Sequence, residues 1–181
     1  MSRENKIIIG RNEAVDFAGY SRRKVPAKID TGADSSSVWV SNVRVDKNGI
    51  LRFNLFGEGS PYYTGKVIKR ENYKVAVVRS ASGHEQIRYR TQFSLRIGGK
   101  RIRALFNLSD RSRNKFPVLV GRRTLSGKFI VDVSLSRFTD NEKVFKSEAK
   151  VLNTELQKDA YAFYKKHYAH DGVSVRKKAK S

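Results

Sequence analysis

The tripeptide Asp30-Thr31-Gly32 is the part of this sequence with the clearest potential for chemistry. It follows a short apolar segment and is continued by Ala33, so an aspartate stands at the end of an expected strand. Peptide hydrolysis by carboxylates needs two of them facing each other, one to activate water and the other to protonate the carbonyl oxygen. Glycine lets the backbone approach the carboxylate closely, and the threonine hydroxyl can brace the loop. Because Asp-Thr-Gly is also an ordinary turn, these three residues alone predict catalysis only weakly.

Other catalytic and cofactor-binding patterns are missing from the sequence. It has no cysteine, which excludes disulfides, thiolate zinc sites, iron–sulfur clusters and a cysteine nucleophile. There is no H-E-x-x-H motif, and the pair His167 and His170 is better interpreted as surface histidines than as zinc ligands. Gly59–Lys66 resembles a phosphate-binding loop only superficially, because Val67 follows the lysine, and no Gly-x-Ser-x-Gly occurs. We therefore expect no metal and no cofactor.

Short strands separated by turns are expected to position Asp30. Asp46-Lys47-Asn48-Gly49 and Gly98-Gly99 predict turns, and Ser80–Gly83 predicts the tip of a hairpin. Six or more strands with almost no helix before residue 135 favour an all-β barrel or sandwich. The expected strands cover residues 6–9, 24–29, 37–45, 50–56, 73–79, 85–90, 93–97, 101–108, 116–120 and 128–133.

The chain changes character near residue 140. Apolar residues at helical spacing predict one amphipathic helix that Asp140 or Asn141 could cap. We interpret this helix as an element that covers the β domain. The predicted organisation is a principal domain over residues 1–139, a helical extension over 140–171 and a basic disordered tail over 172–181. The helical pattern is formed by Phe145, Ala149, Leu152, Leu156, Ala160 and Phe163.

The charge of the chain predicts anionic partners. The 181 residues carry 38 Lys and Arg against 17 Asp and Glu, a formal net charge of +21, most of it before residue 141. Nucleic acid, the ribosome, an acidic peptide and a membrane surface would all be attracted by such a charge. The apolar runs are too short to span a bilayer, and the N-terminus lacks the apolar core of a signal peptide. A soluble cytoplasmic protein without a membrane partner is therefore expected.

A second motif connects Asp30 with a known family. The apolar run Phe116–Val120 ends in Gly121-Arg122, and a short helix is expected after it. Together with Asp30–Asp34 it resembles the retropepsins, the retroviral-type aspartic proteases. The resemblance implies a closed β-barrel with a flap hairpin and one short helix. It also implies that Asp34 pairs with Arg122 to brace the active-site loop, a pairing that a bidentate carboxylate–guanidinium contact would make rigid.

The sequence is still more similar to a bacterial branch of that family. Members of the branch are usually named ATP-dependent zinc proteases, and some are encoded beside the ribosomal-protein glutamate ligase. For those members the resemblance implies an endopeptidase that trims glutamate tails from a ribosomal protein. Asp34 follows the retroviral pattern where the branch more often has Arg, and Gln86 stands where a Glu is expected. The similarity covers about residues 6–135 and is carried by Pro26–Ala33, Arg79–His84, Leu95–Lys100, Leu119–Arg122 and Gly127–Asp132.

The number of Asp-Thr-Gly motifs predicts a homodimer. Only one is present, so a mechanism with two carboxylates needs Asp30 of a second copy across a two-fold axis. The hairpin Tyr73–Arg90 would then be the flap, with Ser82, Gly83 and His84 at its tip in contact with substrate. We predict a homodimeric aspartic endopeptidase for an acidic, for example glutamate-rich, peptide. The alternative is a non-catalytic basic β-barrel that binds RNA or the ribosome, supported by the aromatic and basic residues of Tyr161–Tyr168.

Overall fold

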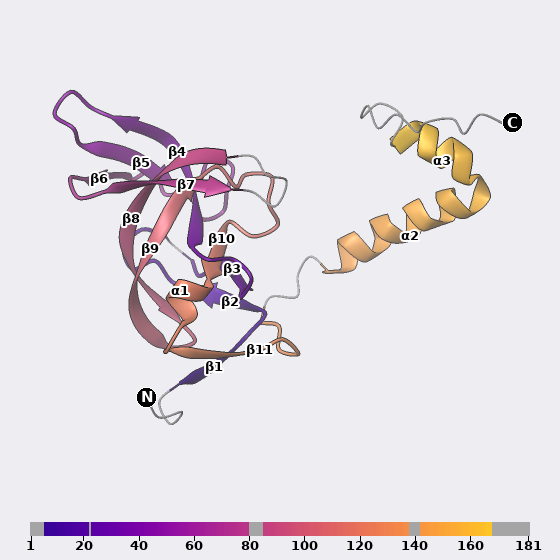
Figure 1. The fold of residues 1–181 in the computed structure, drawn as a ribbon, viewed down its shortest axis with the longest axis horizontal. Helices are drawn as coiled ribbons and strands as arrows, with labels where there is room; N and C mark the ends of the chain where they lie inside the picture. Colours follow the sequence, from indigo (N-terminus) through magenta and orange to yellow (C-terminus); the bar gives the residue numbers. More distant parts are fainter. Residues whose placement is uncertain (1–5, 22, 80–84, 138–141, 168–181) are drawn as a thin grey trace, which may run out of the picture. The chain divides into compact units, whose positions relative to one another are not determined.

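The computed structural model describes residues 6–21, 23–79, 85–137 and 142–167. The chain divides into two compact units, Met1–Phe138 and Thr139–Ser181. The first unit is built almost entirely of strands (Figure 1), which confirms the predicted mostly-β character. Its elements are β1 Ile7–Gly10, β2 Asn12–Val15, β3 Val25–Asp30, β4 Ser36–Val45, β5 Leu51–Leu55, β6 Val67–Arg70, β7 Lys74–Arg79, β8 Glu85–Ile97, β9 Lys100–Ser109, β10 Val118–Gly121, α1 Arg122–Leu125 and β11 Phe129–Asp132.

Nine of these strands form one curled sheet. Their order is β2-β3-β10-β4-β9-β8-β7, with β5 paired to β4 and β6 to β5, while β1 and β11 form a separate parallel pair. One isolated bridge, between Asp16 and Arg96, joins the chain after β2 to β8. No continuous ladder closes the ring among the described residues, so the predicted closed barrel is not found. The ladder between β2 and β8 does not extend beyond this bridge, because β2 ends at Val15 and the chain then turns. The turn is marked by the Tyr20 N–H, which donates to the Phe17 carbonyl at 2.8 Å.

Aromatic side chains fill the interior of the sheet. Phe17 is fully buried and meets Phe93 and Phe106 edge-on, with ring centroids 5.7 and 5.8 Å apart. Phe93, Leu95 and Ile97 alternate with more exposed residues along β8, as the sequence pattern predicted. This packing fixes β8 and β9, the two strands that carry side chains towards the loop after β3.

The hairpin β7–β8 presents two different faces. Val77 lies opposite Ile87, and both side chains are exposed on one face. Ala76 lies opposite Arg88 on the other face, which Arg90 shares because it is two residues further along β8. The predicted flap tip, Ser82, Gly83 and His84, lies outside the described residues.

The second unit contains two helices, α2 Glu142–Lys158 and α3 Ala160–His167. The sequence predicted one helix, and the difference has a local cause. The Asp159 Oδ1 accepts hydrogen bonds from the N–H groups of Tyr161 and Ala162, both at 3.0 Å, which is the arrangement of a helix N-cap. The predicted caps Asp140 and Asn141 and the tail 172–181 lie outside the described residues, and the predicted domain bounds and covering role stay predictions. None of the described helices is long and apolar enough to cross a membrane.

Candidate active site

Asp30 stands at the end of β3, side by side with the end of β10. The two strands are parallel, and Asp30 lies opposite Gly121 in their register. Along β3 the residues alternate, so that Ala27 and Ile29 are buried while Lys28 and Asp30 share the other face. The Asp-Thr-Gly and Gly-Arg motifs are therefore brought together by strand pairing, although about ninety residues separate them in the sequence.

The loop after Asp30 is a tight turn held by the aspartate itself. The Ala33 N–H donates to the Asp30 carboxylate at 3.1 Å. A Cβ added to Gly32 would lie 3.5 Å from Asp30 Oδ1, which is ordinary contact, so within one chain this approach does not require glycine. Thr31 is exposed, and none of the described residues hydrogen-bonds its hydroxyl, so the expected brace is not seen within one chain.

Lys28 forms an ion pair with Asp30 and favours its ionised form. Its Nζ lies 3.0 Å from Asp30 Oδ2, and its side chain is 54% exposed. Partial burial acts to raise the pKa of Asp30, but the hydrogen bond and charge of Lys28 and the N–H groups of Ala33 and Gly32 outweigh it, so the pKa lies below its ordinary value. In the single chain Asp30 is therefore a carboxylate at neutral pH. Lys28 was not singled out from the sequence, although its position two residues before Asp30 in an expected strand places both side chains on one face.

Gly121 allows β10 to pack directly against the loop. A Cβ at this position would lie 2.6 Å from the Ser35 carbonyl carbon and oxygen and 2.8 Å from the Ala33 oxygen. The next residue continues the contact, because the Arg122 N–H donates to the Ala33 carbonyl at 2.8 Å. The end of β10 thus packs directly on the loop because Gly121 has no side chain, and the first residue of α1 hydrogen-bonds the loop backbone.

Two arginines hold the Asp34 carboxylate. Arg122 Nη2 pairs with Oδ1, and Arg123 Nη2 lies 2.9 Å from Oδ2. The structure thus brings together the pair Asp34 and Arg122 that the resemblance implied, and adds Arg123, which sequence reasoning missed. All three side chains are about half exposed or more, so these contacts orient the loop more than they stabilise the fold.

A buried hydroxyl pair supports the same junction. Ser36 Oγ lies 2.8 Å from Thr124 Oγ1 and also accepts a hydrogen bond from the Gly121 N–H at 3.0 Å. Both side chains are buried. They connect the start of β4, the end of β10 and α1, and no sequence motif marked either residue.

Further cations face the loop from β8 and from the segment after β9. Arg90 lies on the same face as Arg88, and its Nε donates to Asn107, which in turn donates to Ser35, so this face overlooks the loop. Burial lowers the pKa of the half-buried Arg111, the charge of Arg88 lowers it further, and the Asp30 carboxylate acts in the opposite direction. Arg88 and Arg111 remain charged, since an arginine stays protonated even with such shifts. Arg111 thus interacts electrostatically with both Arg88 and Asp30.

The described residues do not fit a zinc site. No three His, Asp or Glu side chains among them are grouped so that they could hold a metal ion. His167 instead lies 3.3 Å from Glu155 and packs on Phe163, with ring centroids 4.5 Å apart. His84 and His170 lie outside the described part of the chain.

Comparisons with known proteins place the segment that contains this site in a family. The model of the RimB-like family, described as retropepsin-like aspartic endopeptidase RimB, matches residues 8–142. Relatives named "Probable alpha-L-glutamate ligase" include one from Shewanella pealeana, 28% identical over 74% of this chain, and one from Parasynechococcus marenigrum, 28% identical over 70%. The chain spans only 30% and 28% of the length of these two relatives.

A solved structure shares the fold. The crystal structure of a protein of unknown function from Legionella pneumophila superposes with a TM-score of 0.53 and 24% identity. The match covers 72% of this chain and 95% of that protein, and at this identity it shows the fold alone. The family match extends over most of the chain and includes β3, the loop after it, β10 and α1. This chain therefore belongs to the RimB-like family of retropepsin-like aspartic endopeptidases.

Proposed function

We propose that two copies of this chain form an aspartic endopeptidase that cleaves acidic peptides between two Asp30 carboxylates. The observation that carries the proposal is the junction of β3 with β10, where Asp30 ends one strand beside Gly121. The loop that holds it is fixed by the Arg122 N–H and by the ion pairs of Asp34. Membership of the family supports the same reaction.

The second carboxylate would come from a second copy. The other carboxylate of the loop, Asp34, is occupied by Arg122 and Arg123. Two Asp30 side chains across a two-fold axis would share one proton, because two adjacent like charges are unfavourable. The ionised partner would take a proton from water, while the protonated partner would donate to the carbonyl oxygen of the scissile bond. Lys28 of each copy would favour the ionised form of the pair. The tip of the β7–β8 hairpin, with Ser82, Gly83 and His84, is the proposed substrate clamp.

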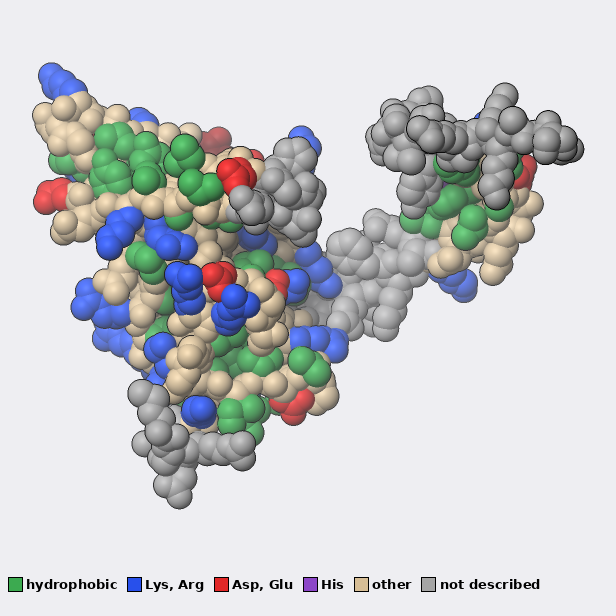
Figure 2. All heavy atoms as spheres, in the orientation of Figure 1, with side chains coloured by type: hydrophobic (Ala, Val, Ile, Leu, Met, Phe, Trp, Pro, Cys, Tyr) green, Lys and Arg blue, Asp and Glu red, His purple; other side chains and the backbone are tan. Residues whose placement is uncertain are grey.

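An acidic substrate is favoured by the charges near Asp30. Lys28 forms an ion pair with Asp30, and Arg111 interacts electrostatically with both Asp30 and Arg88. On the face shown in Figure 2, Lys and Arg side chains gather across the middle of the first unit, with only scattered acidic ones. Such a field attracts anionic ligands and speeds their association. Since similar segments occur in relatives named glutamate ligase, glutamate-rich peptides are the first substrates to test.

The test measures both the role of Asp30 and the number of copies required. Cleavage of a glutamate-rich peptide should be lost in Asp30→Asn and retained in Asp132→Asn, a matched change on β11. When equal amounts of wild-type and Asp30→Asn protein are refolded together, active dimers should fall to about a quarter if both carboxylates are needed. Activity that falls only in proportion to the wild-type fraction would rule out the shared pair, and full activity of Asp30→Asn would rule out the mechanism.

Binding of RNA or the ribosome is the second candidate. Tyr161 on α3 is 67% exposed, and Lys165 Nζ lies 4.7 Å from the centre of its ring. Exposed aromatic rings beside lysines are suited to stacking on bases. This function predicts RNA binding that weakens steeply with salt and is lost in Tyr161→Ala but unchanged in Asp30→Asn. The endopeptidase predicts the reverse pattern for peptide cleavage.

A further inference from the structure

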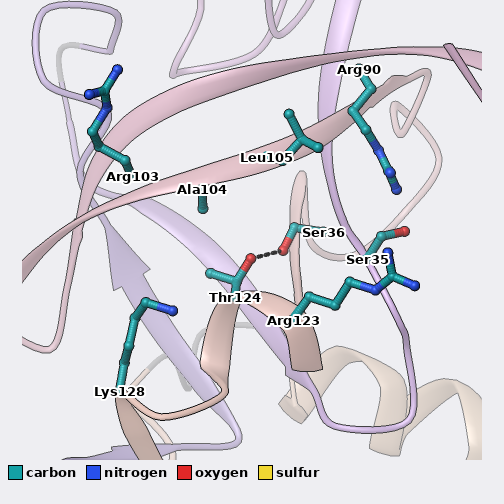
Figure 3. A pocket seen from close by; sticks show the side chains of 9 residues that line it. All are labelled: Ser35, Ser36, Arg90, Arg103, Ala104, Leu105, Arg123, Thr124 and Lys128. Atoms are coloured by element: carbon teal, nitrogen blue, oxygen red, sulfur yellow. Dashed lines mark hydrogen bonds between the residues drawn. The ribbon is translucent and has the colours of Figure 1, made fainter. Parts of the chain in front are cut away.

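A small cationic pocket lies beside the active-site loop and shares Ser36, Arg123 and Thr124 with the junction that holds this loop. Its volume is about 160 Å³, and its walls come from the start of β4, from β8, β9 and α1, and from the segment before β11 (Figure 3). Four of its lining residues are Lys or Arg, and none is acidic. The lining residues are Ser35, Ser36, Arg90, Arg103, Ala104, Leu105, Arg123, Thr124 and Lys128.

A buried amide organises one wall of this pocket. Asn107 is fully buried on β9, its Oδ1 accepts from Arg90 Nε at 2.9 Å, and its Nδ2 donates to Ser35 Oγ at 2.8 Å. Both outer residues are thereby held in fixed positions by one side chain that solvent does not reach. Because Ser35 Oγ already accepts from Asn107, its own hydrogen is free to point towards a ligand.

The wall presents donors that the protein leaves open. Arg90 binds Asn107 only through Nε, and no group in the described part of the chain accepts from its two Nη atoms. Arg123 contacts Asp34 through Nη2 alone. In Figure 3 the guanidinium groups of Arg90 and Arg123 approach Ser35 from opposite sides, while Arg103 extends away from them. Two guanidinium groups and a hydroxyl converging on one hollow are the donor set that binds a carboxylate or phosphate group.

We propose that Arg90, Arg123 and Ser35 form an oxyanion subsite that binds a side-chain carboxylate of the acidic peptide, away from the bond that is cleaved. The inference rests on the proposed function for the identity of the ligand. Ser35 belongs to the same short segment as Asp30, so a peptide bound at Asp30 needs only a few further residues to place a carboxylate here. An unbroken run of glutamates would offer a carboxylate at whichever of its residues reaches this subsite. The subsite would select acidic peptides by affinity, independently of the catalytic carboxylates.

The experiment measures peptide binding without turnover. A fluorescent glutamate-rich peptide is titrated, at constant ionic strength, into full-length protein that carries Asp30→Asn. Loss of a charge-assisted hydrogen bond from Arg90→Gln should raise the Kd about tenfold or more, with a smaller increase for Ser35→Ala. Arg101→Gln removes the same charge from an exposed site on β9 outside the pocket and should change the Kd by less than about twofold. Thermal unfolding of each variant establishes that it is folded, and Ser35→Ala provides the test if Arg90→Gln is not.

Competition then distinguishes the sources of the oxyanion. Inorganic phosphate should displace the peptide from the Asp30→Asn protein and lose that effect in Arg90→Gln. The proposal is overturned if Arg90→Gln and Ser35→Ala bind the peptide as tightly as their parent, or if phosphate binds without displacing it, which would indicate a separate ion site. It is also overturned if an RNA oligonucleotide, and not the peptide, loses affinity in Arg90→Gln. If peptide binding depends on Arg90 but the protein with Asp30 intact never cleaves the peptide, the endopeptidase function alone is refuted and the subsite stands.

Discussion

Replacement of Gly121 by alanine tests whether the loop that carries Asp30 is held by close packing of β10. Gly121 has φ −87° and ψ 169°, an extended conformation that alanine adopts freely, so any cost of the substitution is steric. The new Cβ would meet three backbone atoms of Ser35 and Ala33 at 2.6 to 2.8 Å, and backbone cannot move aside as a flexible side chain can. Overpacking of this kind costs up to about 3 kcal/mol. The reduced freedom of the unfolded chain returns about 0.5–1 kcal/mol, which leaves a net loss of about 2 kcal/mol.

Urea unfolding measures this loss directly. With a slope of about 2 kcal/mol per molar urea, the midpoint of Gly121→Ala should fall by about 1 M. The matched control is Gly32→Ala, in the loop that Gly121 packs against, whose Cβ would make only an ordinary contact at 3.5 Å and should leave the midpoint nearly unchanged. An unchanged midpoint for Gly121→Ala, or an equal fall for both variants, would refute the claim that the absence of a side chain at Gly121 holds the loop.

Three further predictions follow from contacts around the loop and in α3. Burial acts to raise the pKa of Asp30, and Lys28 together with the N–H groups of Ala33 and Gly32 outweighs it, so Lys28→Gln should raise this pKa in an NMR titration of the carboxyl carbon. A lowered folded-state pKa adds stability that is present above the ordinary pKa of 3.8 and is lost as the pH falls through the folded-state pKa. The difference in free energy of unfolding between wild type and Lys28→Gln should therefore narrow as the pH falls below 3.8. A difference that stays constant with pH would contradict the role given to Lys28. Ser36→Ala and Thr124→Val should each cost about 1–2 kcal/mol in urea unfolding, and the double variant less than their sum, because the two hydroxyls bond each other at 2.8 Å. Asp159→Ala should reduce the helical circular dichroism signal by loss of a cap worth about 1 kcal/mol, and an unchanged signal would show that the cap does not hold α3.

Much of the fold could be predicted because strand formation leaves a local pattern. Phe93, Leu95 and Ile97 alternate in the sequence and are buried in β8, since successive side chains of a strand point to opposite faces. The closed barrel could not be decided in this way, because closure depends on which strands pair at the two ends of the sheet. The break between α2 and α3 could have been suspected from Asp159, a residue type that favours caps, but the apolar spacing continued through it.

By itself, the sequence determined the catalytic candidate and its motif partner. Asp30 with Thr31 and Gly32, and later Gly121-Arg122, are short contiguous patterns, and such patterns can be seen before any folding is considered. Only the tertiary structure decided which side chains surround them. Lys28 on Asp30 depends on which face of β3 is exposed, and the contact of Asn107 with Ser35 depends on the pairing of β9 with β4, across 72 residues. Alternation along β3 places Lys28 and Asp30 on one face, but strand register and burial, which are properties of the whole sheet, decide that this face is exposed and that Asn107 reaches Ser35.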